Sequence, residues 1–396
     1  MKVIVIGAGL GGLCLAQGLS QEGIEVEVYE QDPGVEARFQ GYRIGLNPSG
    51  FEALKSCLPV RLHALLEATS GDLTGPGRLL DEQLNDIRME GREAKTDAVE
   101  ESVVIDRHVL RHLLLAGLQE KVHFGKKLTR YETLSDGTVR VCFADSASAC
   151  CDLLVGADGV GSAVRRQLVG PVEPVDTGLR GVIGRTPLDR RFASLVPGRG
   201  TMVSGPGLDM FLGKMQFREP PHLAAEKWAP GVYLPETPSY LRWIMLLPPE
   251  HPGVLGQKER KGTAAIATIL ELIQGWHPDL RELVRQADRD NSGFGPIRAL
   301  GPVPAWESQA VTMLGDAVHA TAATGGNGAN TALLDAALLC AKLGEVNRGA
   351  ASLPPSLEDY NRQVLSCGSD AVQQSLRKAD EFQNLGTRVR NARHPR

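Results

Sequence analysis

The segment Val3-Ile-Val-Ile-Gly7-Ala-Gly9-Leu10-Gly-Gly12 near the start of the chain indicates how the protein folds. A short apolar strand runs into three glycines with the spacing G-x-G-x-x-G, and a helix-like stretch follows. At this spacing Gly7 permits a tight turn, Gly9 lets backbone approach a pyrophosphate, and Gly12 lets the helix pack closely on the strand. The helix N-terminus adds free N–H groups and a partial positive charge. The segment therefore predicts an α/β fold that begins with a dinucleotide site.

A second strand strengthens this prediction. Residues 25–30 alternate and end in Glu30, an acid placed to hold both hydroxyls of an adenosine ribose, and Gln31 follows it. A glycine-rich turn without a ligand would not explain the acid. Strand, glycines, helix and acid together predict a dinucleotide site, whose expected contacts include Leu10 and Gln31. The pattern does not distinguish FAD from NAD.

Composition excludes several classes of function. The chain has 396 residues and a net charge of −4, which provides no basic field for nucleic acid or for an anionic membrane. It contains no run of 18 apolar residues, so we expect no membrane span. Seven cysteines without a C-x-x-C pair suit a reducing compartment, and we expect the cytoplasm. Basic residues near the C-terminus, such as Arg377 and Lys378, are interpreted as a frayed, solvated tail.

The order of patterns predicts a discontinuous nucleotide-binding domain of residues 1–70, 101–170 and 300–345. Buried strands that end in glycine and aspartate recur near residues 152–159 and 311–316, and Asp136-Gly137 predicts a hairpin between them. Residues 71–100 and 171–299 are expected to form a substrate-binding domain with a mainly antiparallel sheet, because prolines and short strand-like runs alternate there. Residues 346–396 are expected to be helical.

Three strand ends are expected to converge on one extended cofactor. They are the glycine turn, Asp158-Gly159 and Gly315-Asp316, and carboxyl ends of parallel strands line the ligand crevice of such sheets. A further glycine-rich stretch, residues 325–330, precedes a long helix. Its N–H groups can face the pyrimidine edge of a flavin, where the reduced ring carries negative charge.

Together with Arg107, these motifs resemble the class A flavoprotein monooxygenases, the para-hydroxybenzoate hydroxylase-like family, over about residues 1–170 and 300–345. The resemblance implies a glutathione reductase-type FAD-binding domain with an inserted antiparallel sheet and a C-terminal helix. It also implies a shared role in holding FAD for Gly7, Gly9, Gly12, Glu30, Arg38, Gly45, Arg107, Leu128, Asp158, Asp316, Gly326, Gly328, Ala329 and Asn330. Within that set, Glu30 would bind the ribose, the backbone of Leu128 would meet adenine, and Asp316 would bind the ribityl chain.

The resemblance also implies an activity. NADPH or NADH would reduce FAD, O2 would form a C4a-hydroperoxyflavin, and one oxygen atom would pass to an aromatic or polycyclic small molecule. No catalytic side chain is expected, because the flavin itself carries the chemistry. Candidate substrate contacts in the central region are Arg185, Asp209, Phe211, Met215 and Trp243. We expect a monomer or a homodimer.

One departure from the family pattern lies at residues 320–324. The family usually carries a proline before the glycine run, whereas this chain has Ala320-Thr-Ala-Ala323-Thr324. Alanine leaves a loop more conformational freedom than proline. The departure puts the precision of oxygen transfer or the choice of substrate in question, while FAD binding should survive.

Other interpretations remain. An NAD-dependent dehydrogenase would not need Gly315-Asp316, but a flavin-dependent reductase on the same fold, or a flavin-binding protein without turnover, stays possible. His108 and His112 are four residues apart, as zinc ligands can be, yet no third ligand is evident, so no metal is expected. Hydroxylation, Baeyer–Villiger oxidation and epoxidation are not distinguished, nor is NADPH from NADH.

Overall fold

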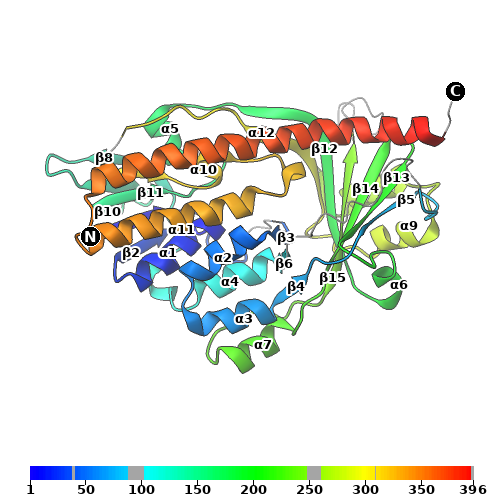
Figure 1. Ribbon diagram of the computed structural model, residues 1–396, viewed down its shortest axis with the longest axis horizontal. Coiled ribbons are helices and arrows are strands. Elements are labelled where there is room, and N and C mark those ends of the chain that lie inside the picture. Colours follow the sequence, from blue (N-terminus) through cyan, green and yellow to red (C-terminus); the bar gives the residue numbers. More distant parts are fainter. Residues whose placement is uncertain (38–40, 88–101, 248–259, 308, 394–396) are drawn as a thin grey trace.

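The structure is a computed structural model that describes residues 1–37, 41–87, 102–247, 260–307 and 309–393. A nucleotide-binding half lies at one end of the elongated molecule and a large sheet at the other, and a long C-terminal helix runs along both (Figure 1). The chain passes between the two halves several times, because segments from residues 1–72, 103–169 and 311–347 build most of the first half.

The first half is organised around a five-stranded parallel sheet in the order β18-β11-β1-β2-β7. These strands are β18 (Val311–Met313), β11 (Leu153–Gly156), β1 (Lys2–Ile6), β2 (Glu25–Tyr29) and β7 (Val122–His123). Strand β1 pairs with β2 on one side and with β11 on the other, so the strand order reverses beside β1. Ligands bind at such a switch point, outside the carboxyl ends of the strands.

Helices α1 (Leu10–Gln21), α2 (Pro48–Cys57) and α11 (Gly328–Asn347) pack against one another beside this sheet. The first half also contains η1 (Val60–Leu62), α3 (His63–Ala68), α4 (Arg107–Leu115), η2 (Gln119–Lys121), α5 (Ala163–Val169), α10 (Asp316–His319) and η3 (Ala323–Gly325). Their apolar faces share one core with β1 and β11, in which residues such as Ile4, Leu13 and Leu154 have no exposed surface. The core fixes the glycine turn relative to the start of α11.

Two small antiparallel sheets complete this half. The sheet β10-β9-β8 contains β8 (Leu128–Thr133), β9 (Val139–Phe143) and β10 (Ser148–Cys151), and the expected hairpin at Asp136-Gly137 is confirmed by the β8–β9 pairing. The sheet β3-β6-β4 contains β3 (Arg43–Leu46), β4 (Ser70–Asp72) and β6 (Val103–Asp106). Strand β3 lies between the nucleotide-binding half and the large sheet.

The large sheet has seven strands in the order β16-β17-β12-β15-β14-β13-β5. They are β16 (Arg260–Lys261), β17 (Gly293–Leu300), β12 (Pro174–Pro187), β15 (Tyr240–Leu247), β14 (Leu208–Met215), β13 (Gly200–Gly205) and β5 (Gly77–Asp81). Neighbouring strands run antiparallel, except for β5, which lies parallel to β13. The expected fold class, an α/β nucleotide-binding domain with an inserted, mainly antiparallel sheet, is confirmed.

The two faces of the large sheet have different neighbours. Leu241, Trp243 and Met245 of β15 point into a core formed with α6 (Arg190–Ala193), α8 (Thr263–Leu272) and α9 (Pro278–Arg285). The alternate residues of β15 point the other way, toward the nucleotide-binding half, because side chains alternate along a strand. We call these the helix-covered face and the inner face. Helix α7 (Pro221–Trp228) lies beside α3.

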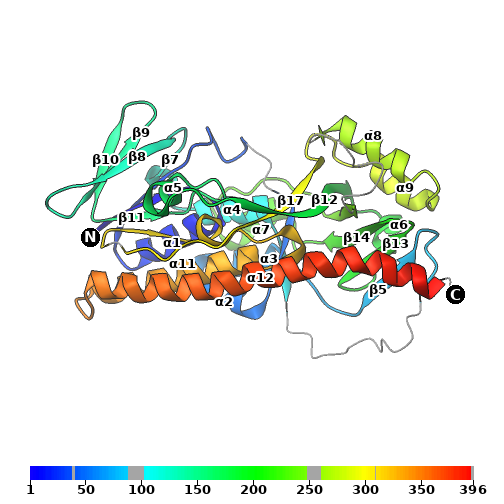
Figure 2. The same cartoon turned by 90° about the horizontal axis from the view of Figure 1, so that it is seen from above.

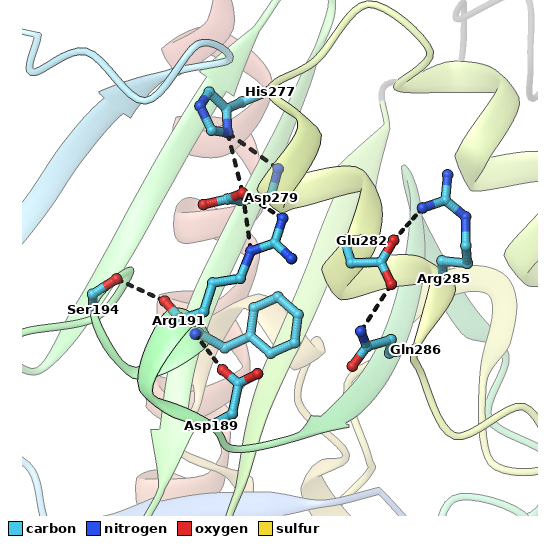
Figure 3. Close-up of polar contacts among 9 residues, drawn as sticks. Asp189, Arg191, Ser194, His277, Asp279, Glu282, Arg285 and Gln286 are labelled. Carbon is cyan, nitrogen blue, oxygen red and sulfur yellow. Dashed lines mark hydrogen bonds and ion pairs between the residues drawn. The ribbon is translucent and has the colours of Figure 1, made fainter.

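Polar contacts join α6 and α9 over the helix-covered face (Figure 3). Arg191 Nε donates to Asp279 Oδ1 at 3.0 Å, and His277 Nδ1 accepts the N–H of Asp279 at the start of α9 (3.1 Å). Asp189 caps α6 by accepting the N–H of Phe192 at 2.7 Å. Of these contacts, the Arg191–Asp279 pair links α6 to α9, while the other two lie at the start of each helix.

The C-terminal helix α12 (Leu353–Arg393) spans both halves (Figures 1 and 2). It contacts α10, α11 and η3 in the first half and β12 and β17 of the large sheet. The expected helical segment is present, but the interpretation of a frayed tail is wrong for its first part, because Lys378 Nζ donates to the carbonyl of Gly325 at 3.0 Å. Apolar residues of α12, such as Leu376 and Ala379, pack on the sheet and hold the helix there.

Two further findings concern the chain as a whole. Within the described ranges, each helix is too short or too polar to traverse a lipid bilayer. All seven cysteines are free thiols, and four of them are buried.

Candidate functional site

The glycine turn between β1 and α1 packs tightly at two of its glycines and is open at the third. Gly7 has a φ of +109°, and a Cβ there would lie 2.3 Å from the carbonyl oxygen of Ala157. A Cβ on Gly12 would lie 2.2 Å from the carbonyl oxygen of Gly7. Gly9, by contrast, has a φ of −77°, and a Cβ there would meet no atom within 4 Å. The turn therefore leaves an open cradle beside Gly9.

Glu30 follows the last residue of β2, as the sequence predicted, and lies against this cradle. Its side chain is 5% exposed; Oε2 accepts the N–H of Ala8 at 2.8 Å and Oε1 that of Asp32 at 2.9 Å. Gln31 is exposed beside it, and the N–H of Lys126 donates to the Glu30 carbonyl at 2.8 Å. That last bond brings the chain leading to Leu128, which is buried, to the same end of the sheet.

Asp158 anchors the turn after β11. Its Oδ2 accepts the N–H of Ala163 at 2.6 Å and that of Val164 at 3.2 Å, at the start of α5. Burial raises the pKa of Asp158, although these hydrogen bonds act in the opposite direction. Since the preceding residue, Ala157, packs on Gly7, the carboxylate shapes the glycine turn from behind.

The third strand end carries a buried ion pair and an exposed acid. Asp335 Oδ2 accepts the N–H of Gly315 at 2.9 Å and lies 2.6 Å from Nε2 of His319. Burial lowers the pKa of His319, but the charge and hydrogen bond of Asp335 outweigh it, and the pKa is raised. This pair fixes α10, from which the exposed Asp316 points toward the start of α11, its Oδ1 3.9 Å from where a Cβ on Gly328 would lie.

The N-termini of α1 and α11 lack side-chain caps. Asn47 caps α2 and Asp106 caps α4, whereas neither Gly9 at α1 nor Asn327 at α11 caps its helix with a side chain. The first N–H groups of both helices are thus free of side-chain acceptors from the cap position, and such groups bind anionic or electron-rich ligand atoms. They include the N–H groups of Leu10 at α1 and, at α11, of Gly328, Ala329 and Asn330.

Asn330 holds α11 against β3. Its Nδ2 donates to the carbonyl of Gly45 at 3.0 Å, and its Oδ1 accepts the N–H of Asn47 at 3.0 Å. The side chain is 5% exposed and fully used in this bridge. Gly45 is therefore fixed beside the start of α11.

Helix α12 restrains the loop that lacks the family proline. Ser375 Oγ accepts the N–H of Ala322 at 3.0 Å, and Thr324 Oγ1 donates to the Ser375 carbonyl at 3.1 Å. Ala323, which stands where the family carries its proline, lies between these two hydrogen-bonded residues. Lys378 adds its bond to Gly325, whose neighbour Gly326 adopts a φ of +68°. The loop is thus held by tertiary hydrogen bonds instead of a proline ring.

These features fit FAD. The cradle at Gly9 and the uncapped start of α1 suit a pyrophosphate, Glu30 suits the adenosine ribose, and Asp316 suits a ribityl chain on its way to α11. The model for the FAD binding domain family matches residues 1–198 and 303–375. The chain belongs to this FAD-binding family.

Relatives agree with the assignment. The chain is 32% identical to a dual O-methyltransferase/FAD-dependent monooxygenase of Phaeosphaeria nodorum over 86% of its own length, and spans 40% of the length of that relative. It is 27% identical to an FAD-dependent urate hydroxylase of Klebsiella pneumoniae, covering 96% of this chain and 90% of the relative. A solved structure from Photorhabdus luminescens subsp. laumondii, whose name places it with FAD containing monooxygenases, superposes with a TM-score of 0.80 at 30% identity, covering 97% and 98% of the two chains. The resemblance to class A flavoprotein monooxygenases is confirmed.

A cavity of about 170 Å³ opens at the junction of the FAD-binding half and the large sheet. Arg107 and Tyr42 line it from the first half, and Arg185 from β12. The Arg185 guanidinium is 3.0 Å from Asp288 Oδ2, and its Cζ lies 5.2 Å from the ring centroid of Tyr42 and 5.5 Å from that of Tyr240. Arg185 therefore sits in a preformed aromatic and acidic setting at the cavity. Arg38 lies outside the described residues.

The structure divides the expected substrate contacts between the two faces of the sheet. Arg185, Asp209 and Phe211 belong to the inner face, since each shares a register with inner-face residues of β15. Trp243 is on the helix-covered face with no exposed surface, so its selection as a substrate contact is corrected. Met215 is on the inner face but also has no exposed surface, and it is corrected as well.

Sequence analysis missed Arg242, Arg43 and Tyr240, which lie on or against the inner face. The alternation of residues 240–245 carried the signal: once Trp243 and Met245 are assigned to one face, Tyr240 and Arg242 belong to the other. Tyr240 Oη donates to Asp106 Oδ2 at 2.7 Å, which ties β15 to the start of α4. No local pattern marked Arg43, because its contacts with the large sheet, to Gly213 and Lys214, are more than 150 positions away in the sequence.

The expectation that His108 and His112 have no third partner is wrong. Glu36 Oε1 lies 3.1 Å from His108 Nε2 and 2.9 Å from His112 Nε2. The three ligand atoms lie within 4.8 Å of one another, close enough to share one cation. The cluster lies at the rim of the same cavity, where Glu36 and His108 form part of the lining.

Proposed function

We propose that the protein is an FAD-dependent monooxygenase that uses NADPH or NADH and O2 to insert one oxygen atom into an aromatic or polycyclic small molecule. The overall reaction consumes one substrate, one O2, one NAD(P)H and one proton, and yields the oxygenated product, water and NAD(P)+. The observation that carries the proposal is that the start of α11 and strand β3, which belong to the FAD-binding half, adjoin the inner face of the large sheet. Small-molecule sites form at such domain junctions.

FAD, when bound, supplies the redox chemistry by taking a hydride from NAD(P)H and activating O2. The residues of the chain hold and tune it. The N–H groups at α1 would bind the pyrophosphate, Glu30 the ribose and Asp316 the ribityl chain. The N-terminus of α11 would stabilise negative charge on the pyrimidine edge of the ring, by about 0.3–2 kcal/mol.

On the substrate side, Arg185, Asp209 and Phe211 are the retained candidates. Phe211 is half-buried on the inner face, where an aromatic ring can pack on it. Asp209 accepts a hydrogen bond from Ser204 Oγ at 2.6 Å, so its carboxylate is held in place. A flat substrate between this face and the FAD site would be shielded from water, as oxygen transfer requires.

The relatives support the reaction class and leave the substrate open. One is named for O-methyl transfer as well as FAD-dependent oxygenation, and the chain matches only part of it. Another is named for hydroxylation of urate, a small ring compound. We propose the same type of ring substrate here, a monomer or homodimer as the assembly, and the cytoplasm as the location, where the seven free thiols would stay reduced.

The visible spectrum of the purified protein, followed by NADPH and NADH oxidation with a panel of phenols and polyketides, tests this proposal. We expect a flavin spectrum and substrate-stimulated oxidation, with a product heavier by one oxygen that derives from 18O2. NADPH oxidation without an oxygenated product across the panel would favour a flavin reductase. A colourless protein that takes up no added FAD would overturn the proposal.

A further inference from the structure

Two histidines of α4 and one glutamate from another segment converge on a single point. His108 and His112 are four residues apart on the helix, so both imidazoles project from the same side of it. Glu36 reaches them from the segment that follows β2 (residues 31–37), and its Oε1 lies 3.1 Å from His108 Nε2 and 2.9 Å from His112 Nε2. We call these three residues the histidine–glutamate cluster.

The spacing of the cluster is close to that of ligands around one small cation. Its three ligand atoms lie within 4.8 Å of one another. Ligand atoms about 2.0–2.2 Å from a zinc ion, at tetrahedral angles, lie about 3.3–3.6 Å apart. The two separations from Glu36 Oε1 are shorter than this by only about 0.2–0.7 Å. The Glu36 side chain is 65% exposed, so it has room to make up the difference.

The segments that carry the ligands are already fastened to each other. Asp106 caps α4, and its Oδ1 accepts the N–H of His108 at 2.9 Å. Arg111, on the same helix, donates from Nη1 to the carbonyl of Val35 at 3.0 Å. That bond holds the residue before Glu36 against α4. A site built on supported segments loses little conformational freedom when a ligand binds.

The cluster has one closed side and one open side. The His112 side chain is 9% exposed, and its ring lies edge-on to that of Tyr233, with 5.5 Å between the ring centroids. His108 and Glu36 are more exposed and line the cavity at the junction of the two halves. A water molecule or a donor atom of a small molecule can therefore reach a fourth position from the cavity. Three protein ligands with one open position are typical of zinc sites that bind an exchangeable ligand.

The charges beside the cluster are compatible with a cation. Arg111 is the cationic residue between the two histidines, and its Nη2 lies 3.8 Å from Glu30 Oε2, so its charge is balanced by that carboxylate. A neutral imidazole can offer the lone pair of Nε2 to a metal, and its ring proton then resides on Nδ1. A cation would thus replace two N–H···O contacts of Glu36 by three metal–ligand bonds.

We propose that His108, His112 and Glu36 form a site for a divalent transition-metal cation of the zinc type, which joins the segment after β2 to α4. Imidazole suits Zn²⁺ and its neighbours such as Co²⁺ and Ni²⁺, whereas Mg²⁺ and Ca²⁺ prefer ligand sets made of oxygen. The ion would fasten the chain that follows Glu30 and so stabilise the FAD-binding half. This inference goes beyond oxygenation and does not depend on it.

Zinc binding to the FAD-loaded protein, after its metal has been removed with a chelator and the chelator dialysed away, tests the proposal. We expect calorimetry with zinc chloride to show one ion per chain at micromolar or lower concentration. Glu36→Gln keeps an oxygen that can accept both imidazole N–H groups, but it removes the anionic ligand. Glu36→Gln and His112→Gln should each weaken zinc binding by more than the roughly 10- to 100-fold that follows loss of a residue supporting a ligand.

His123→Gln is the matched control. His123 Nε2 also faces a carboxylate, Glu27 Oε2 at 3.7 Å, but among the described residues the two belong to no cluster of three metal-ligating side chains. This variant should bind zinc as the native protein does. Thermal unfolding adds a second readout. Without metal, Glu36→Gln should unfold at the same temperature as the native protein, and zinc should raise the unfolding temperature of the native protein alone.

Unchanged zinc affinity in both Glu36→Gln and His112→Gln, or binding only at millimolar zinc, would show adventitious binding to the surface and overturn the proposal. A Glu36→Gln variant that unfolds earlier without metal, yet binds zinc normally, would show that the cluster is a hydrogen-bonded support and would overturn it too. None of these measurements uses turnover. Failure of the zinc site therefore leaves the proposed monooxygenase standing, and failure of the monooxygenase leaves the zinc site standing.

Discussion

Replacing Gly9 by alanine should separate FAD binding from folding. Gly9 is already in a backbone conformation that alanine adopts, with a φ of −77°, and a Cβ there meets nothing within 4 Å. Alanine is a poorer helix cap than glycine, which costs some stability, but it also reduces the entropy of the unfolded chain by about 0.4–1 kcal/mol. The two effects offset each other, so we expect Gly9→Ala to change the free energy of unfolding by less than about 1 kcal/mol.

The effect on FAD should be much larger. The added methyl group occupies the open cradle, so the pyrophosphate can no longer approach the N–H groups at the start of α1. Each hydrogen bond lost to a charged group lowers affinity by roughly 10- to 100-fold. Titration of FAD-free protein with FAD, followed by flavin fluorescence, measures this loss, and urea unfolding measures stability.

Gly12→Ala is the matched comparison. Its Cβ would lie 2.2 Å from the Gly7 carbonyl oxygen, a backbone atom that cannot move aside cheaply, and such overpacking costs about 1–3 kcal/mol. We therefore expect Gly12→Ala to lose stability and Gly9→Ala to keep it. Unchanged FAD affinity in Gly9→Ala would show that the pyrophosphate does not lie against Gly9. Equal destabilisation by Gly9→Ala and Gly12→Ala would show that the space beside Gly9 is not open to a methyl group.

Three further predictions concern residues away from the cradle. Asp335→Asn removes a buried charged hydrogen bond and should cost about 1.5–3 kcal/mol. Because the pKa of His319 is raised, this stabilisation is complete below about pH 6.5 and declines as the pH rises through the folded-state pKa. The free energies of unfolding of the native protein and the variant, measured in urea from pH 6 upward, should therefore converge. Trp243→Phe should cost about 0.5–3 kcal/mol in thermal or urea unfolding and leave the KM for substrate unchanged, whereas a raised KM would contradict its place on the helix-covered face. Ser375→Ala leaves the buried N–H of Ala322 without its acceptor and should cost about 1–3 kcal/mol, with faster hydrogen exchange at residues 320–326; native-like exchange there would show that α12 does not restrain the loop.

Sequence alone predicted the parts of the molecule that short segments determine. The glycine turn, Glu30 and the Asp158 and Asp316 strand ends lie together as expected, because each motif encodes its own strand end and parallel strands place those ends at one edge. The hairpin at Asp136-Gly137 follows from local turn chemistry in the same way. The family match supports FAD as the ligand, and the roles of these individual residues toward FAD are predictions.

The substrate side was harder to predict because it depends on which face of a sheet each residue occupies. Trp243 and Arg242 are adjacent in sequence, and only the position of α8 and α9 decides that the tryptophan lies on the helix-covered face and the arginine on the inner face. Arg43 meets Gly213 across 170 positions, a contact for which no local pattern exists. Glu36 reaches His108 and His112 by a similar long-range approach. Such contacts are products of tertiary packing, and periodicity does not report them.

The alternation along β15 also bears on how this protein can evolve. Changes at residues 242 and 244 alter the inner face, where we propose that the substrate binds, while changes at 243 and 245 alter the packing beneath it. Adjacent residues of β15 thus affect different properties, the inner face and the stability of the fold. A substitution on the inner face can therefore be combined with a stabilising substitution at the next position. A library restricted to the even positions of β15 should yield active variants with altered preference more often than one that randomises the whole strand.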